Sequence, residues 1–123
     1  MALQTKGFLN HRQRARHFTE HGADFGASNV NEYEQLADTF LGGPSPLGSA
    51  QECTRKMGDK VRYDPTTETY GVIDSGGVIR TFYKPVPCVS VPASVRAAVR
   101  QAGRCHPYTT NLLYFKAECK HIW

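Results

Sequence analysis

Long apolar runs are missing from this sequence of 123 residues. No stretch approaches the roughly 20 apolar residues of a membrane-spanning helix, and the short apolar patch between Lys6 and His11 is too small for a signal-peptide core. Two metal motifs are missing as well: C-x-x-C occurs nowhere, and no Glu follows His17 directly, so the H-E-x-x-H pattern is absent. We therefore expect a soluble chain that has no membrane association and no zinc-protease centre.

The N-terminal end of the chain has no acidic residues, and the C-terminal end has almost none. Residues 1–19 carry four Lys or Arg and no acid, residues 20–74 carry four against ten Asp or Glu, and residues 75–123 carry seven against one. If the two basic ends fold beside each other, they form a positive face that suits a polyanion, with the acidic middle turned away. Uneven charge is common in small proteins, so this pattern alone does not single out a nucleic-acid-binding protein.

Cysteines are few but even in number. Two disulfides are possible in an oxidising compartment, with three alternative pairings, among Cys53, Cys88, Cys105 and Cys119. A zinc site is the alternative, since Cys105 precedes His106 and His121 follows shortly after the last cysteine. Adjacent Cys and His are not a usual zinc spacing, so free or disulfide-bonded cysteines are favoured.

We assign the whole chain, residues 1–123, to a single domain. Two helices are predicted in its first third. Phe8, Ala15 and Phe18 fall on one side of a helix over residues 7–21, and Gly22 is placed to end it in a left-handed cap. The second helix begins at a capping box formed by Asn29 and Glu32, and its apolar residues recur at helical spacing over residues 33–41.

The remainder of the chain has the character of β-structure. An antiparallel meander is predicted from a strand ending near Tyr63, the stretch TYGVID at residues 69–74 and the stretch VIRTFYK at residues 78–84. A short helix over residues 93–102 precedes a fourth predicted strand, NLLYFKA, at residues 111–117. The predicted fold class is α+β: two N-terminal helices packed on a four-stranded antiparallel sheet, with a short helix inserted before the last strand.

Three of the five histidines fall in one basic segment, and two of them are one helical turn apart. His17 and His21 share a helix face with Arg14, whereas His11 is interpreted as a surface residue. Neighbouring positive charges should lower the pKa values of the two imidazoles, which suits general acid and base chemistry near neutral pH. The alternative is an exposed basic helix with surface histidines, one of which caps the helix end near Gly22.

The third strand of the meander carries cations and a hydroxyl. Strict alternation places Arg80, Phe82 and Lys84 on one face and Ile79, Thr81 and Tyr83 on the other. A guanidinium, an ammonium and a hydroxyl this close together can hold a phosphate group, and Arg62 adds a cation at a strand end. An ordinary amphipathic strand with a solvated basic face is the alternative.

Four stretches in this order resemble a known family: HFTEHGADFG, NVNEYEQLADTFL, GDKVRYDPTTETYGVIDSGGVIRTFYKP and YTTNLLYF. Together they are similar to the small toxic ribonucleases of the barnase, EndoU, colicin and RelE (BECR) superfamily. The nearest likeness is to the toxin domains of bacterial polymorphic and contact-dependent inhibition systems. The most specific parts are the H-F-x-x-H-G start and the strand from Gly77 to Pro85.

The resemblance implies an endoribonuclease that needs no metal and no cofactor. In such enzymes the ribose 2′-hydroxyl attacks the phosphate and leaves a 2′,3′-cyclic phosphate, and tRNA is the expected substrate. The candidate catalytic residues are His17, His21, Arg62 and Thr81, with Arg62 as the phosphate clamp and Thr81 as a donor to the phosphate. The candidate substrate-binding residues are Arg14, Arg80, Lys84 and Tyr114.

The same resemblance implies a secreted or delivered effector that acts in the cytoplasm of a target cell. Its expected partners are RNA and a cognate immunity protein, which would be acidic enough to cover the basic face. Two other classes stay open: a non-catalytic RNA-binding module and a disulfide-bonded secreted interaction domain. The stretch from Val86 to Tyr108 departs from the family pattern, and it is expected to form either a disulfide-stapled flap or a cover for the sheet edge.

Overall fold

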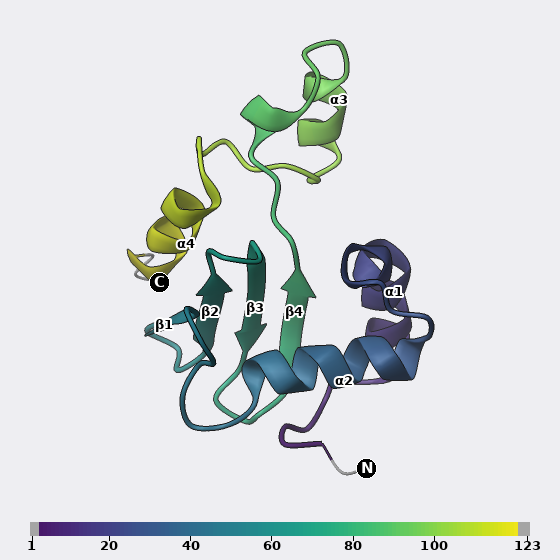
Figure 1. Ribbon diagram of the computed structural model, residues 1–123, viewed down its shortest axis with the longest axis vertical. Coiled ribbons are helices and arrows are strands. Elements are labelled where there is room, and N and C mark those ends of the chain that lie inside the picture. The colour runs from purple at the N-terminus through teal and green to yellow at the C-terminus, as the bar shows by residue number, and fades with distance from the viewer. Residues whose placement is uncertain (1–2, 121–123) are drawn as a thin grey trace.

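The structure is a computed structural model that describes residues 3–120. In chain order the elements are α1 (His11–His21), η1 (Gly22–Phe25), α2 (Val30–Leu41), β1 (Gln51–Thr54), β2 (Lys60–Asp64), β3 (Thr69–Ile73), β4 (Ile79–Tyr83), η2 (Cys88–Ser90), α3 (Arg96–Gln101) and α4 (Asn111–Lys120). The four strands pair in sequence order as an antiparallel meander (Figure 1). The predicted α+β class, with N-terminal helices on a four-stranded antiparallel sheet, is confirmed.

The sheet carries a hydrophobic core on each face. On one face Tyr33, Ala37 and Leu41 of α2 pack with side chains that include Ile73 and Phe82. On the other face Phe115 of α4 packs with side chains of β2 and β3, namely Val61, Tyr63, Tyr70 and Val72. Since successive residues of a strand point to opposite faces, the adjacent Val72 and Ile73 serve different cores.

The stretch predicted as a fourth strand, residues 111–117, is helical, and this prediction was wrong. Asn111 and Phe115 are buried one turn apart, and Cys119 continues the same spacing, which is the period of a helix. The Thr110 hydroxyl accepts a hydrogen bond from the Leu113 amide at 3.1 Å, as a helix N-cap does. The fourth strand is instead β1, a short segment for which no strand was predicted.

The start of the chain and the two helices also differ in detail from the prediction. The first helix begins at His11, four residues later than predicted, because Asn10 caps it by accepting from the Gln13 amide at 2.9 Å. Gly22 has right-handed backbone angles and continues into η1, so its predicted left-handed cap was wrong; Gly26 is the left-handed residue, with φ of 66°. Gly22 is needed for close packing, since an added Cβ would lie 2.5 Å from the Phe18 ring.

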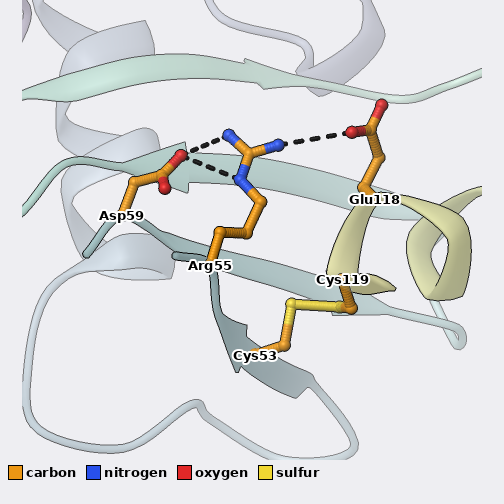
Figure 2. Close-up of a disulfide and its surroundings, with 5 residues drawn as sticks. All are labelled: Cys53, Arg55, Asp59, Glu118 and Cys119. Atoms are coloured by element: carbon orange, nitrogen blue, oxygen red, sulfur yellow. Dashed lines mark hydrogen bonds and ion pairs between the residues drawn. A yellow bond between two sulfur atoms is a disulfide. The ribbon is translucent and has the colours of Figure 1, made fainter. Parts of the chain in front are cut away.

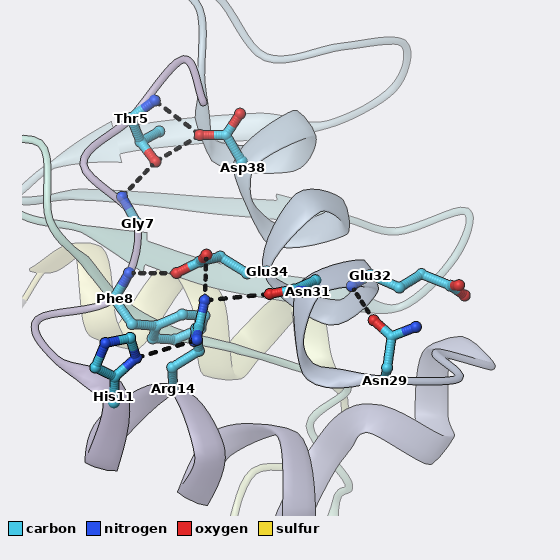
Figure 3. Close-up of polar contacts among 10 residues, drawn as sticks. All are labelled: Thr5, Gly7, Phe8, His11, Arg14, Asn29, Asn31, Glu32, Glu34 and Asp38. Atoms are coloured by element: carbon cyan, nitrogen blue, oxygen red, sulfur yellow. Dashed lines mark hydrogen bonds and ion pairs between the residues drawn. The ribbon is translucent and has the colours of Figure 1, made fainter. Parts of the chain in front are cut away.

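The predicted N-cap of the second helix, Asn29, is confirmed, and Glu32 takes part by accepting from the residue before the cap. The Asn29 side chain accepts from the Glu32 amide at 2.8 Å, and the Glu32 carboxylate reaches back to the Ser28 amide at 3.3 Å. Later in the helix the fully buried Asp38 carboxylate accepts from both the amide and the hydroxyl of Thr5, which fixes the N-terminal segment on α2 (Figure 3). That segment therefore reaches the edge of β4, where Phe8 bridges Ile79 in parallel.

Two disulfides use all four cysteines, which removes the thiolates that the alternative zinc site would need. Cys53 of β1 pairs with Cys119 of α4, and beside this bond Arg55 links Asp59 to Glu118 of α4 (Figure 2). Cys88 pairs with Cys105 and closes the stretch that departs from the family pattern. We call residues 86–108 the arm; it extends beyond the end of β4 and carries α3 (Figure 1). His121, the remaining ligand of the zinc alternative, lies outside the described residues.

Replacing Cys53 and Cys119 together by serine is expected to lower the free energy of unfolding by about 2–4 kcal/mol. The disulfide joins residues 66 positions apart, so its loss releases a long loop in the unfolded chain and loosens α4 from the sheet. Urea unfolding followed by far-UV circular dichroism measures the change. An unchanged midpoint in the double variant, compared with oxidised wild type, would contradict the pairing.

Candidate active site

A cavity of about 830 Å³ lies along β4, one of the two edge strands of the sheet. It is walled by α1 and η1 on one side and by α4 and the base of the arm on the other. Six of the eight predicted site residues line it: His17, His21, Arg80, Thr81, Lys84 and Tyr114. Residues from three separate segments of the chain thus meet at one place.

A β-bulge shapes the cavity side of β4. Val72 pairs with Thr81, but the next residue, Ile73, pairs with Ile79, so Arg80 is the extra residue. Ile79 consequently packs in the same core as Phe82, and the predicted face shared by Ile79, Thr81 and Tyr83 was wrong. Bulges redirect side chains, and here Arg80 is exposed while Thr81 is half-buried at the cavity.

His17 is a buried histidine rather than a surface one. Its side chain is only 9% exposed, its ring stacks on Phe8 with centroids 5.1 Å apart, and its Nδ1 has no hydrogen-bond partner among residues 3–120. A buried nitrogen without a partner costs stability, so a position of this kind calls for an explanation. The His21 ring lies 6.1 Å from that of His17 and 5.2 Å from that of Tyr83.

Both imidazoles have lowered pKa values, as the sequence predicted, but the main cause is different. The pKa of His17 is lowered to about 4, mainly by burial and in part by the charges of Arg16 and His21, against the opposing effect of Glu20. Burial also lowers the pKa of His21, against the opposing effect of the Glu20 and Asp24 carboxylates. A neutral imidazole near neutral pH is ready to accept a proton.

The free energy of unfolding is expected to fall as the pH is lowered from 6.5 towards 4. In this window the unfolded chain binds a proton at His17 that the folded chain does not bind. The contribution of neutral His17 to the free energy of unfolding is therefore fully present above pH 6.5 and is lost as the pH approaches 4. Replacement of His17 by glutamine should flatten the slope of stability against pH, whereas replacement of the exposed His11 should not. Equal slopes in all three proteins, measured by urea unfolding, would contradict the buried neutral state.

Two predicted site residues lie elsewhere. Arg62, the predicted phosphate clamp, is 1% exposed, and its guanidinium donates to the Glu52 carboxylate at 2.6 Å and to the carbonyls of Phe40, Gly42 and Gly43. It closes the loop after α2 against the sheet and is not among the residues that line the cavity, so the structure does not bring the predicted clamp together with the other site residues. Its guanidinium is held by a carboxylate and three backbone carbonyls, which is a structural role.

Arg14 also lies away from the cavity, at the contact between α1 and α2. Its guanidinium pairs with Glu34 at 3.3 Å and donates to Asn31 at 3.3 Å (Figure 3). Its Nη2 lies 3.1 Å from Nδ1 of the exposed His11. The structure therefore does not bring Arg14 together with the predicted site residues of the cavity, and Arg14 joins the two N-terminal helices.

Several cavity residues were missed by the sequence reasoning. Tyr83 shares a hydrogen bond of 2.7 Å with the hydroxyl of Tyr114, and burial raises the pKa values of both phenols. His106 stacks on Tyr114 with ring centroids 4.4 Å apart, and its Nε2 lies 2.7 Å from Asn111 Oδ1. The sequence indicated His106 only as a ligand of the zinc alternative, because its stacking on Tyr114 depends on how the chain folds between the arm and α4.

The charges around the cavity are mixed, and its cations come from β4 (Arg80), from just after β4 (Lys84) and β1 (Arg55), and from the arm (Arg104). Arg80 is exposed and lies 4.0 Å from Asp74, and the Lys84 ammonium lies 5.5 Å from the centre of the Phe25 ring. Glu20 and Asp24 line the histidine side. Within residues 3–120 no group of three or more His, Cys, Asp or Glu side chains is placed to hold a metal ion, and no helix is long and apolar enough to cross a membrane.

The fold and the cavity define a small α+β protein whose candidate site combines imidazoles, a hydroxyl and cations. No family model matches the sequence, and no curated protein matches it. Among solved structures, the chain is similar to a ribonuclease from Escherichia coli complexed with its inhibitor protein, at 20% identity and a TM-score of 0.46. The likeness covers 75% of this chain and 99% of that one. We infer the function below from the residues that line the cavity.

Proposed function

We propose that this protein is an endoribonuclease that cleaves RNA by attack of the ribose 2′-hydroxyl on the adjacent phosphate. The observation that supports the proposal is the meeting, in one cavity, of two imidazoles of lowered pKa with the Thr81 hydroxyl and two cations, Arg80 on β4 and Lys84 directly after it. These groups are the ones that this reaction needs: a base, an acid, and donors for the charge that develops on the phosphate oxygens. No step requires a metal ion, because side chains of this chain can supply each role.

The roles follow from the surroundings of each group. His17, neutral near neutral pH, takes the proton of the 2′-hydroxyl, whose oxygen then bonds to phosphorus while the bond to the 5′-oxygen breaks. We assign to His21 the donation of a proton to that leaving oxygen: burial lowers its pKa, but both Glu20 and Asp24 oppose this effect, whereas at His17 only Glu20 does so. Thr81, Arg80 and Lys84 stabilise the phosphate oxygens, and the products are a 2′,3′-cyclic phosphate and a 5′-hydroxyl. DNA, which lacks the 2′-hydroxyl, should not be cut.

We propose further that the RNA is tRNA and that the protein is a toxin delivered into a competing bacterium. Both proposals come from the sequence resemblance to ribonuclease toxins. The basic N-terminal and C-terminal segments of the chain suit an acidic immunity protein, which would protect the producing cell by covering the cavity. Growth arrest on cytoplasmic expression, relieved by co-expression of that partner, is the corresponding test in cells.

The direct test is incubation of the purified protein with total bacterial RNA in the presence and absence of EDTA. We expect cleavage in both, with new 3′ ends that can be ligated only after the cyclic phosphate has been hydrolysed to a monoester and a phosphatase has removed that monoester. Intact RNA would contradict the ribonuclease proposal, and cleavage that stops on chelation would contradict the metal-free mechanism. RNA that is bound but left intact would favour the alternative class, a non-catalytic RNA-binding module.

A further inference from the structure

The arm, residues 86–108, is fixed at its base and free at its tip. The Cys88–Cys105 disulfide joins its two ends, and two backbone hydrogen bonds reinforce this closure: Cys88 N to His106 O at 2.8 Å and His106 N to Val86 O at 2.9 Å. At the tip α3 packs on η2, and the pair extends away from the sheet (Figure 1). The arm is thus a closed loop with a defined point of attachment.

That point of attachment is part of the cavity wall. The His106 ring is 8% exposed, stacks on Tyr114 and is joined to Asn111, whose amide nitrogen donates to Pro85 O at 2.9 Å. These contacts connect the end of the arm to the start of the arm and to α4. Residues directly before His106 are therefore held in place at the cavity.

The charged residues of the arm are all basic: residues 86–108 contain three arginines and no Asp or Glu. The three arginines differ in what they do. Arg96 donates to the carbonyl oxygens of Val91 at 3.0 Å and Val89 at 3.4 Å, so it serves the fold of the arm itself. Arg100 is exposed on α3 and is not among the described residues that line the cavity.

Arg104 is the one of these three arm arginines that lines the cavity. It is exposed, and within residues 3–120 its side chain makes no hydrogen bond or ion pair. It lies near enough to His21 for its charge to contribute to the lowered pKa of that imidazole, although burial is the larger cause. A guanidinium with free donors that faces the imidazole side of a cavity is suited to a bidentate contact with phosphate.

We infer that Arg104 binds the phosphate of the RNA at the bond to be cut, and that the arm is the element that presents it. The inference rests on the proposed function and gives Arg104 the role that the sequence assigned to Arg62. The arm also exposes Val89 and Val95, which would suit a protein partner, but neither lines the cavity, whereas Arg104 does. RNA is therefore the ligand assigned to Arg104.

The test compares Arg104→Ala with Arg100→Ala, two exposed arginines of the arm, of which only Arg104 lines the cavity. The substrate is a 5′-labelled RNA oligonucleotide that spans the bond mapped for wild type in total RNA. Loss of a donor that stabilises a reacting phosphate is expected to lower kcat/KM by about 10²–10³-fold in Arg104→Ala. We expect Arg104→Lys to recover part of this loss, and Arg100→Ala to stay within about threefold of wild type because it removes only a distant charge.

The outcomes separate the inference from the proposed function. If wild type leaves RNA intact, the proposed function fails. If wild type cleaves and Arg104→Ala cleaves as fast as Arg100→Ala, the inference about Arg104 is overturned. Equal reductions of kcat/KM in the two variants would indicate a diffuse charge effect. Wild-type kcat/KM in both would indicate that the arm binds a protein partner instead. Equal melting temperatures of the two variants, both changed only at exposed side chains, exclude unfolding as the cause of a difference.

Discussion

Replacement of His17 by alanine is expected to lower kcat for RNA cleavage by about 10²–10⁴-fold, which is the usual contribution of a general acid or base. The imidazole is the group that takes the 2′-hydroxyl proton in the proposed mechanism, and its lowered pKa keeps it neutral and able to do so. The measurement is the rate of cleavage of the labelled oligonucleotide at saturating substrate. His11→Ala is the matched control, because His11 lies on the same helix but is exposed and outside the cavity.

The structural contribution of His17 has to be measured beside its chemical one. Its ring is buried against Phe8, so alanine also leaves a cavity in the α1 contact. His17→Gln keeps most of the volume and removes the acid–base group, and it should be as inactive as alanine while its unfolding midpoint stays closer to wild type. Activity of the glutamine variant within threefold of wild type would show that His17 is only a packing residue.

The sequence could predict the parts of the fold whose signals are local. The Asn29 cap, the helix that follows it and the β3–β4 hairpin depend on residues a few positions apart, and all three are present. The last helix was missed because a short apolar run such as residues 111–117 satisfies both strand and helix patterns. Its helical state depends on where Phe115 and Cys119 are buried, which is a tertiary property.

The candidate site divides in the same way. His17 and His21 share a helix face and Thr81 lies on a predictable strand, so these residues could be proposed from their spacing. Arg104 could not, since its place at the cavity depends on a disulfide pairing and on the contacts of His106, and the sequence determines neither. The Arg80 bulge shows the same limit, because one extra residue reverses the faces that alternation assigns.

Arg62 shows why a cation on a strand cannot be assigned to substrate from sequence alone. A strand pattern indicates on which face a side chain lies, but not whether a loop covers that face with carbonyl groups. Here the loop after α2 presents the carbonyls of Gly42 and Gly43, at 2.8 and 3.0 Å from the guanidinium. The arginine is consequently used to close the loop on the sheet.

Replacement of Arg62 by methionine is therefore expected to lower the free energy of unfolding by about 3–5 kcal/mol, the usual cost of removing one partner of a buried ion pair. The change leaves the Glu52 carboxylate without its partner at 2.6 Å and removes the donor from three carbonyls. Urea unfolding near neutral pH measures the loss. Arg80→Met is the matched control: Arg80 is exposed, with only a 4.0 Å contact to Asp74, so its loss should change stability by less than about 0.5 kcal/mol.

Arg62→Lys separates charge from geometry. A lysine keeps the positive charge but has a single ammonium, which cannot reach a carboxylate and three carbonyls from one position as the guanidinium does. We expect it to be destabilised nearly as much as the methionine variant. A phosphate clamp would give the opposite pattern, namely wild-type stability in both variants with a large loss of cleavage. That pattern would return Arg62 to the active site and would mean that the loop after α2 opens when RNA binds.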